Sequence, residues 1–143
     1  MKLTQISIFL ENKSGRLYEA CTLLGENDIN IRALTVAESA DFGILRIVVD
    51  KPNEALSLLK ENGFASNSTK IVAVEVEDTP GGLSDILKVF SENEINVEYM
   101  YGFVEKFREE ALLVFRFENT EKALEVLKKN HIKAITEGDI VDL

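Results

Sequence analysis

The stretch Glu11-Asn12-Lys13-Ser14-Gly15-Arg16-Leu17 recurs 66 positions later as Glu77-Asp78-Thr79-Pro80-Gly81-Gly82-Leu83. With that shift, seven of the 26 residue pairs over residues 6–31 are identical, and apolar positions largely match apolar ones. After a slip of two residues the match resumes around Ala55 and Ala123. Because self-similarity at a fixed spacing indicates repetition of one structural unit, we infer an internal duplication.

The hydrophobic periodicity changes in the same order within each copy. A strand-like alternation of apolar residues comes first, and a segment with helical spacing follows it. Two further strands, a second helix and a weakly patterned last strand complete the unit. In the first copy these elements cover residues 6–10, 15–24, from 29, 43–50, a helix entered through Pro52, and 64–69. In the second copy they cover residues 72–76, 81–90, from 95, 111–118, a helix entered through Asn119-Thr120, and 132–136.

The order strand, helix, strand, strand, helix, strand predicts an α+β fold. It is the order of the ferredoxin-like βαββαβ sandwich, an antiparallel sheet with helices on one face. We therefore predict two such domains, at residues 1–68 and 69–143. A domain this small has a marginal core, so each half is expected to depend on a partner.

The third strand of each copy indicates what its two faces contact. One parity is apolar in both copies and is predicted to lie under the helices, namely Leu45, Ile47 and Val49 with Leu113, Phe115 and Phe117. The opposite parity is also largely apolar, with Ile44, Arg46 and Val48 against Leu112, Val114 and Arg116. Such a face would be left exposed by a lone sandwich, which predicts pairing of the modules within one chain or in a homodimer.

Composition and charge exclude several classes of partner. The chain has 45% apolar and 29% charged residues, which is ordinary for a soluble globular protein. Residues 1–66 carry a net charge of −2 and residues 67–143 one of −7, so neither nucleic acid nor an anionic membrane is an expected partner. The N-terminal residues alternate as a strand does, unlike a signal peptide, and no run is long enough to span a membrane. A cytoplasmic location is the default expectation.

The sequence favours no enzymatic activity. His131, the single histidine, aligns with Gly63 just after a helix and is interpreted as a solvated residue. Cys21, the single cysteine, aligns with Leu87 on a core-facing stripe and is predicted to be a buried hydrophobe without thiolate character. A nucleophile–base pair, a metal-ligand cluster and a nucleotide-binding motif are not found, so we predict no cofactor and no metal.

The glycine turn and its surroundings resemble a known family. The run from Asp78 to Leu83, the helix to Phe90 and the segment Asn93-Glu94-Ile95-Asn96-Val97 resemble the signature of the ACT domain, a ferredoxin-like module that senses amino acids. The first copy departs slightly, since Ser14 stands where the family usually has proline. That copy is also similar to the ACT domain of acetolactate synthase regulatory subunits. The resemblance covers nearly the whole chain as two modules.

The turn between first strand and first helix is also the predicted ligand site. The first turn of a helix leaves backbone N–H groups unpaired, and a glycine lets a ligand carboxylate approach them. The resemblance implies a pocket completed by a neighbouring module. The candidate ligand-binding residues are Asn12, Lys13, Ser14, Gly15, Arg16, Leu17 and Asn30 in the first copy, and Asp78, Thr79, Pro80, Gly81, Gly82, Leu83 and Asn96 in the second.

A purely structural role is the alternative for each of these residues. The glycines serve the turn, Asn12 and Asp78 form caps or Asx turns, and the two later asparagines satisfy the backbone where a strand begins. Arg16 favours a carboxylate site in the first copy, because Gly82 replaces it in the more acidic second copy.

Two functional hypotheses follow. The first is a non-enzymatic, allosteric sensor that binds a free amino acid, or a close relative, between ACT modules and passes its occupancy to a partner. The second is a regulatory subunit that docks onto an amino-acid biosynthetic enzyme, with ligand binding secondary or absent.

Overall fold

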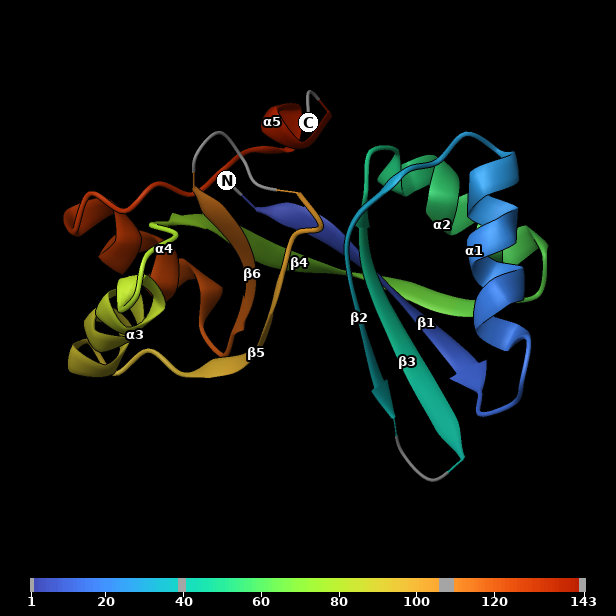
Figure 1. Cartoon of the computed structure of the whole chain (residues 1–143), viewed down its shortest axis with the longest axis horizontal. Coiled ribbons are helices and arrows are strands. Elements are labelled where there is room, and N and C mark those ends of the chain that lie inside the picture. Colours follow the sequence, from blue (N-terminus) through green and yellow to red (C-terminus); the bar gives the residue numbers. More distant parts are fainter. Residues whose placement is uncertain (1, 39–40, 106–109, 142–143) are drawn as a thin grey trace. The chain divides into compact units, whose positions relative to one another are not determined.

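A computed structural model describes residues 2–38, 41–105 and 110–141 of the chain (Figure 1). Its residues divide into two compact units, which we call the first module (Thr4–Thr69) and the second module (Lys70–Leu143 with Met1–Leu3). The order strand, helix, strand, strand, helix occurs in both copies as the sequence predicted, and the predicted α+β, ferredoxin-like fold class is confirmed.

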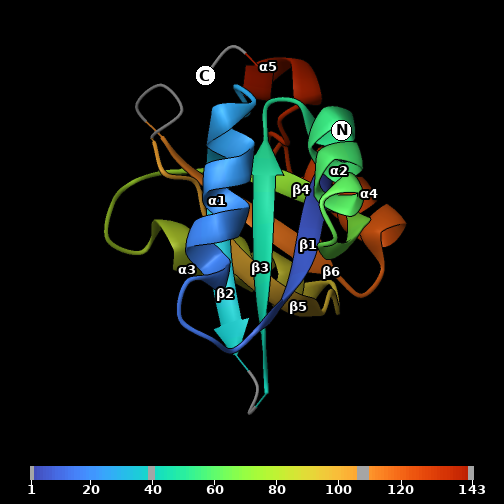
Figure 2. The same ribbon diagram turned by 90° about the vertical axis from the view of Figure 1, so that its right-hand side faces the viewer.

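The first module is an antiparallel sheet with two helices on one face. Figure 2 shows both helices in front of the strands. The strand order is β2-β3-β1-β4, and β3 pairs antiparallel with both β1 and β2. The elements are β1 (Leu3–Glu11), α1 (Arg16–Glu26), β2 (Ile31–Glu38), β3 (Phe42–Val49), α2 (Pro52–Glu61) and β4 (Ala65–Val76).

The second module repeats this plan from the C-terminal part of β4 onward. Its strand order is β4-β6-β5, and β6 pairs antiparallel with both neighbours. The remaining elements are α3 (Gly82–Glu92), β5 (Val97–Gly102), β6 (Ala111–Phe117), α4 (Thr120–Lys129) and α5 (Glu137–Val141). Pro52 begins α2, and the Asn119 side chain caps α4 by accepting from the Lys122 N–H at 3.1 Å, so both predicted helix entries are confirmed.

Each module has its own hydrophobic core between helices and sheet. The predicted core parity is confirmed, since Leu45, Ile47 and Val49 are buried in the first core and Phe115 and Phe117 in the second. In the second core the Phe90 ring packs edge-on against both Phe115 and Phe117 at centroid distances of 5.3 and 5.1 Å. Residues of the opposite parity are buried as well, namely Val48, Leu112 and Val114.

The last strands of the two copies differ from the prediction. In the first copy residues 65–69 of the weakly patterned segment 64–69 belong to β4, a single strand of 12 residues that also contains the next predicted strand. In the second copy the strand predicted at residues 132–136 is wrong, because it is reduced to one bridge between Val74 and Ala134. Two residues after that bridge, the Thr136 N–H donates to Asp139 Oδ2 at 2.9 Å and the chain turns into α5.

The four long helices end in the same way. Each is followed by an asparagine whose side-chain amide donates to the carbonyl four residues earlier, at 2.8 Å in every case. The next residue is in the left-handed region, and the one after it donates its N–H to the carbonyl five residues before it, which is the Schellman motif. The left-handed residues are Asp28 (φ 60°), Gly63 (φ 82°), Glu94 (φ 55°) and His131 (φ 55°).

Candidate ligand site

The first predicted site turn joins β1 to α1 and is exposed. Gly15 precedes the helix with φ 92°, a left-handed conformation that L side chains rarely adopt, and no side chain caps the helix. The first intrahelical bond runs from the Glu19 N–H to the Gly15 carbonyl at 2.9 Å. The N–H groups of Leu17 and Tyr18 come before that bond, so the helix offers uncapped donors next to an exposed turn.

The second predicted site turn repeats this backbone pattern 66 positions later. Gly81 precedes α3 with φ 86°, again without a side-chain cap. Three backbone hydrogen bonds correspond one to one in the two turns. In the first turn they are Lys13 N–H to Glu11 (2.7 Å), Arg16 N–H to Lys13 (3.4 Å) and Glu19 N–H to Gly15 (2.9 Å); in the second, Thr79 N–H to Glu77 (2.9 Å), Gly82 N–H to Thr79 (3.0 Å) and Asp85 N–H to Gly81 (2.9 Å).

The two turns differ where Arg16 and Gly82 correspond. A Cβ added to Gly82 would lie 2.0 Å from the Glu77 carbonyl oxygen and 3.1 Å from its carbon. These are backbone atoms, so only glycine fits there without a shift of the chain. Gly82 is buried, whereas Arg16 carries a full side chain at the matching position.

The Arg16 side chain is already engaged within the first module. Its Nη1 donates to Glu19 Oε2 at 2.6 Å, and its guanidinium lies 4.8 Å from the centroid of the Phe64 ring. The guanidinium therefore has one anionic and one aromatic partner within the module, while its buried Nε makes no hydrogen bond to any described residue. Arg16 would have to leave these partners, or share its charge with them, to bind a ligand carboxylate.

The polar side chains of the first turn lie beside a surface hollow of about 480 Å³. It is lined by Glu11, Asn12, Lys13, Asp41 and Phe42. Lys13 pairs with Glu11 at 2.7 Å, and that hydrogen bond lowers the pKa of the Glu11 carboxyl. Asn12 donates its backbone N–H to the Asp41 carbonyl at 3.1 Å, while its exposed side chain makes no hydrogen bond to any residue that the structure describes.

Apart from Gly82, the residues of the second turn are exposed as well. Asp78, the counterpart of Asn12, does have an interaction partner. Thr79, Pro80 and Gly81 are exposed, and Leu83, the counterpart of Leu17, is 38% exposed against 43% for Leu17. In the first turn Ser14 is exposed as well. The Asn12 side chain therefore has no hydrogen-bond partner among the described residues, whereas Asp78 interacts with another residue.

Within one module, Asn30 and Asn96 lie at the opposite end of the helix from the glycine turn. The 11-residue helices α1 and α3 separate them from Gly15 and Gly81, a distance of about 16 Å along the axis. Asn30 instead exchanges hydrogen bonds with Asp50, at 3.0 and 3.2 Å. The structure thus does not bring the two parts of the predicted site together inside a module.

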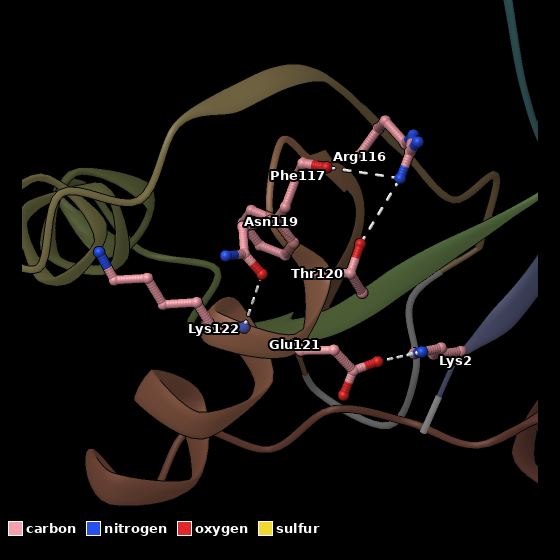
Figure 3. Close-up of polar contacts among 7 residues, drawn as sticks. All are labelled: Lys2, Arg116, Phe117, Asn119, Thr120, Glu121 and Lys122. Carbon is pink, nitrogen blue, oxygen red and sulfur yellow. Dashed lines mark hydrogen bonds and ion pairs between the residues drawn. The ribbon is translucent and has the colours of Figure 1, made fainter.

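Asn96 lies in a second hollow of about 520 Å³, at the start of α4. Asn119 and Thr120 line this hollow, whereas Arg116 does not. Figure 3 shows Arg116 beside Thr120, with its Nη1 donating to the Phe117 carbonyl at 3.4 Å. In the first module Lys51 takes the position of Asn119 and donates to the Asp28 carbonyl at 2.8 Å. The hollow is lined by Glu94, Glu118 and Glu121 and by Lys122, so its lining has a net negative charge that disfavours a carboxylate ligand.

The residues considered for catalysis are placed as follows. His131 is exposed at the end of α4. Cys21 packs against the first core but is only partly buried, which corrects the prediction of a buried residue; this partial burial raises the pKa of its thiol. Among the residues that the structure describes, no group of three or more His, Cys, Asp or Glu side chains is arranged to hold a metal ion.

Two ferredoxin-like modules in tandem, each with a left-handed glycine before an uncapped helix, define the class to which the chain belongs. The family model described as "ACT domain pair" matches residues 1–143. The chain therefore belongs to the ACT domain pair family, as its sequence resemblance predicted.

Solved structures support this assignment. The chain is similar to protein BT0572 from Bacteroides thetaiotaomicron, with 41% identity, a TM-score of 0.93, and coverage of 100% of this chain and 98% of that one. The fold is shared with the regulatory subunit of aspartate kinase from Thermus thermophilus at 17% identity and a TM-score of 0.61, covering 88% and 90% of the two chains. The corresponding subunit from Thermus flavus matches at 16% identity and a TM-score of 0.58, covering 90% of this chain and 92% of that one.

A search of curated protein sequences finds no match. In the part of the chain that the structure describes, no helix combines the length and the apolar character needed to cross a membrane.

Proposed function

We propose that this ACT pair is a non-enzymatic, cytoplasmic sensor that binds a free amino acid at an interface between ACT modules. The ligand would bind at the turn from Asn12 to Leu17, and a second module would complete the binding site. Occupancy of the site would be passed to a protein partner. The observation that carries the proposal is the uncapped N-terminus of α1 behind an exposed left-handed glycine.

The chemistry of a free amino acid fits this turn. Its carboxylate would accept hydrogen bonds from the N–H groups of Leu17 and Tyr18, where the helix dipole also favours negative charge. Its ammonium would donate to the side-chain oxygen of Asn12, which has no partner among the described residues. The exposed Leu17 side chain supplies apolar surface beside the turn.

The first turn is the better candidate of the two. Asn12 is available where Asp78 is engaged, and the second module carries the larger negative charge. This ranking rests on Asn12 and the charge balance, since Arg16 is held by Glu19 and Phe64. Asn30 and Asn96 would take part only if a neighbouring module brought one of them to the turn of another.

Transmission of occupancy would follow from linkage. A ligand shared by two modules stabilises the arrangement that contains it, by no more than its difference in affinity for that arrangement. At a ligand concentration 100 times the dissociation constant, one site adds about 2.7 kcal/mol to the stability of the binding state. A shift of that size is sufficient to change the population that a partner recognises.

Thermal-shift measurements of the full chain against the twenty amino acids test the proposal. We expect one amino acid or a small chemical group of them to raise the melting temperature. In calorimetry with that ligand, Asn12→Ala should weaken binding about ten- to a hundredfold, because a charge-assisted hydrogen bond contributes roughly 1.5–3 kcal/mol.

The matched control is Asp78→Ala in the second turn, which should leave affinity unchanged. Circular dichroism of both variants verifies the fold. Unchanged affinity in a folded Asn12→Ala variant, together with a loss in Asp78→Ala, would move the site to the second module. The absence of any stabilising amino acid would overturn the sensor.

The second candidate is a regulatory subunit that docks onto an amino-acid biosynthetic enzyme. The structures that share this fold include chains described as regulatory subunits of aspartate kinase, of nearly the same length. Such a subunit would change the activity of its enzyme with no amino acid present. An enzyme assay with and without the chain, in amino-acid-free buffer, separates this function from the sensor.

A further inference from the structure

The junction that follows the first helix of each module can be compared atom by atom. After α1 the chain turns through left-handed Asp28 into β2, and after α3 it turns through left-handed Glu94 into β5. At both junctions the carbonyl two residues later accepts the N–H of the residue that follows the third strand of the module. The distances are 3.2 Å from the Asp50 N–H to Asn30 and 3.1 Å from the Glu118 N–H to Asn96.

The first module holds a cation at this junction. Lys51 lies just before α2, and its Nζ donates to the Asp28 carbonyl at 2.8 Å. The same Nζ lies 3.4 Å from Asp28 Oδ2. This carbonyl lies just beyond the C-terminal end of α1, where the helix dipole favours positive charge. An ammonium group is therefore the species that this arrangement of carbonyl and carboxylate binds.

The second module has the acceptors without the cation. Asn119 stands at the position of Lys51, and Figure 3 shows its side chain turned to the Lys122 N–H, which donates to it at 3.1 Å. The Glu94 carbonyl accepts no hydrogen bond from any residue that the structure describes. The carboxylates of Glu94 and Glu118 likewise have no partner within residues 2–38, 41–105 and 110–141.

These unpaired acceptors line a hollow that is large enough for a small molecule. Its volume is about 520 Å³, and small-molecule pockets range over about 300–1,000 Å³. Its lining contains three glutamates and one lysine, which gives a net charge of −2. Glu121 is paired with Lys2 (Figure 3), which leaves Glu94 and Glu118 for a ligand. The Lys122 side chain forms no ion pair with a described residue, so it does not replace Lys51.

We propose that this hollow binds a free aliphatic diamine, with one ammonium group at the place that Lys51 Nζ fills in the first module. A protonated primary amine has three N–H donors, so this group donates both to the Glu94 carbonyl and to a carboxylate of the hollow. The second ammonium group pairs with the remaining carboxylate. Glu94 and Glu118 are the charged residues of the site.

Two observations select a diamine over other ligands. Among the described residues, no group of three or more His, Cys, Asp or Glu side chains is arranged to hold a metal ion. A ligand with a carboxylate would meet the unpaired carboxylates of Glu94 and Glu118, and like charges repel. Two ammonium groups instead match these two carboxylates in number. The hollow lies at the opposite end of α3 from Gly81, so it is separate from either glycine turn.

Calorimetric titration of the full chain with 1,4-diaminobutane at low ionic strength tests the site. One equivalent should bind with a dissociation constant of about 1 mM or below, whereas 1,4-butanediol, which has the same carbon chain and no charge, should not bind. Glu94→Gln and Glu118→Gln should each weaken binding about two- to fivefold, as expected for the loss of one solvent-accessible ion pair. Glu125→Gln removes an exposed charge of α4 outside the hollow and should leave affinity nearly unchanged.

Exchanging one residue between the modules gives the sharpest test. Asn119→Lys supplies the ammonium group that the first module has and should abolish binding of the diamine. Asn119→Ala removes the same helix cap but leaves the hollow without a cation, so it should bind as the wild type does. Glu125→Gln is the charge-matched control for Asn119→Lys, because both raise the net charge by one. Circular dichroism verifies the fold, and the three glutamine variants test the site independently of Asn119.

Three outcomes would overturn the proposal. They are a wild type that binds no diamine, a loss of binding in Asn119→Ala as large as in Asn119→Lys, and equal effects of Glu125→Gln and Glu94→Gln. The last would show attraction to the overall charge of the chain. No α-amino acid is present and Asn12 is unchanged in these titrations, so their outcome is independent of the amino-acid site proposed for the first module.

Discussion

The two glycine turns, Asn12 to Arg16 and Asp78 to Gly82, share their backbone hydrogen bonds. They differ in the space that they leave for a side chain at the last residue. Their three hydrogen bonds correspond one to one, and both place a left-handed glycine before a helix. At the next residue, however, the second turn accepts no side chain at all, while the first carries Arg16. The N–H bond at that position is also longer in the first turn, 3.4 Å against 3.0 Å.

This difference shows how a duplicated unit can diverge while its fold is retained. The backbone bonds that start the helix are needed in both copies, so the glycines at 15 and 81 occur in both. The side chains around them are not needed for the turn and have changed. The first copy has a free Asn12 beside a hollow, whereas the second has an engaged Asp78 and a close backbone contact.

The largest effect on stability is expected from Gly82→Ala. Its Cβ would lie 2.0 Å from the Glu77 carbonyl oxygen, so the turn must shift, at a cost of about 1–3 kcal/mol. The counterpart Arg16→Ala loses an exposed ion pair and a cation–π contact and should cost less than about 1 kcal/mol. Urea unfolding gives both values. Equal costs would show that the two turns are packed alike.

The next effect is expected from alanine at the left-handed glycines. An added Cβ meets no atom within 4 Å at Gly15 or at Gly81, so only the positive φ opposes it. Gly15→Ala and Gly81→Ala should therefore each lower the free energy of unfolding by about 1 kcal/mol, and the two losses should be equal. A clear inequality in the free energy of unfolding would contradict the shared backbone of the two turns.

Periodicity and duplication predicted most of the fold, because they report on residues that are buried in both copies. The parity of Leu45, Ile47 and Val49, the helix entry at Pro52 and the Asn119 cap were all readable from residue type and spacing. The final strand at residues 132–136 was predicted wrongly, since apolar alternation there is equally compatible with a chain that touches β4 once and leaves it.

The candidate site was less accessible to sequence reasoning. A glycine pair at 81–82 signals a special backbone, but not which of the two glycines has positive φ and which avoids a collision. The aromatic partner of Arg16 could not be seen either, because Phe64 is distant in sequence and is brought near by the fold. Asn30 and Asn96 recur with constant spacing from the glycines, yet a helix length separates them within a module.

A smaller effect, of opposite sign, is expected at the helix ends. Asp28, Glu94 and His131 adopt positive φ after α1, α3 and α4, whereas the corresponding residue after α2 is Gly63. Glycine at any of the three should stabilise the chain by about 0.5 kcal/mol, because strain is relieved and part of the gain is lost to the entropy of the unfolded chain. Gly63→Ala, the matched reversal, should destabilise. Urea midpoints that fall for Glu94→Gly would contradict the Schellman geometry.

The smallest difference between the modules to be tested is at Cys21, which corresponds to Leu87. Both side chains are partly buried against their cores, and burial raises the pKa of the Cys21 thiol. Since the thiolate is the reactive form, the native chain should react with a thiol reagent more slowly than the denatured chain, and its rate should rise with pH at higher values than the denatured chain's does. Stopped-flow labelling across pH, with the chain in native buffer and in urea, measures both.

Cys21→Leu, which installs the residue of the second module, serves as the unreactive control and should remain folded. Identical pH profiles in the two buffers would mean that the thiol is solvated, and that α1 does not face its core as α3 does.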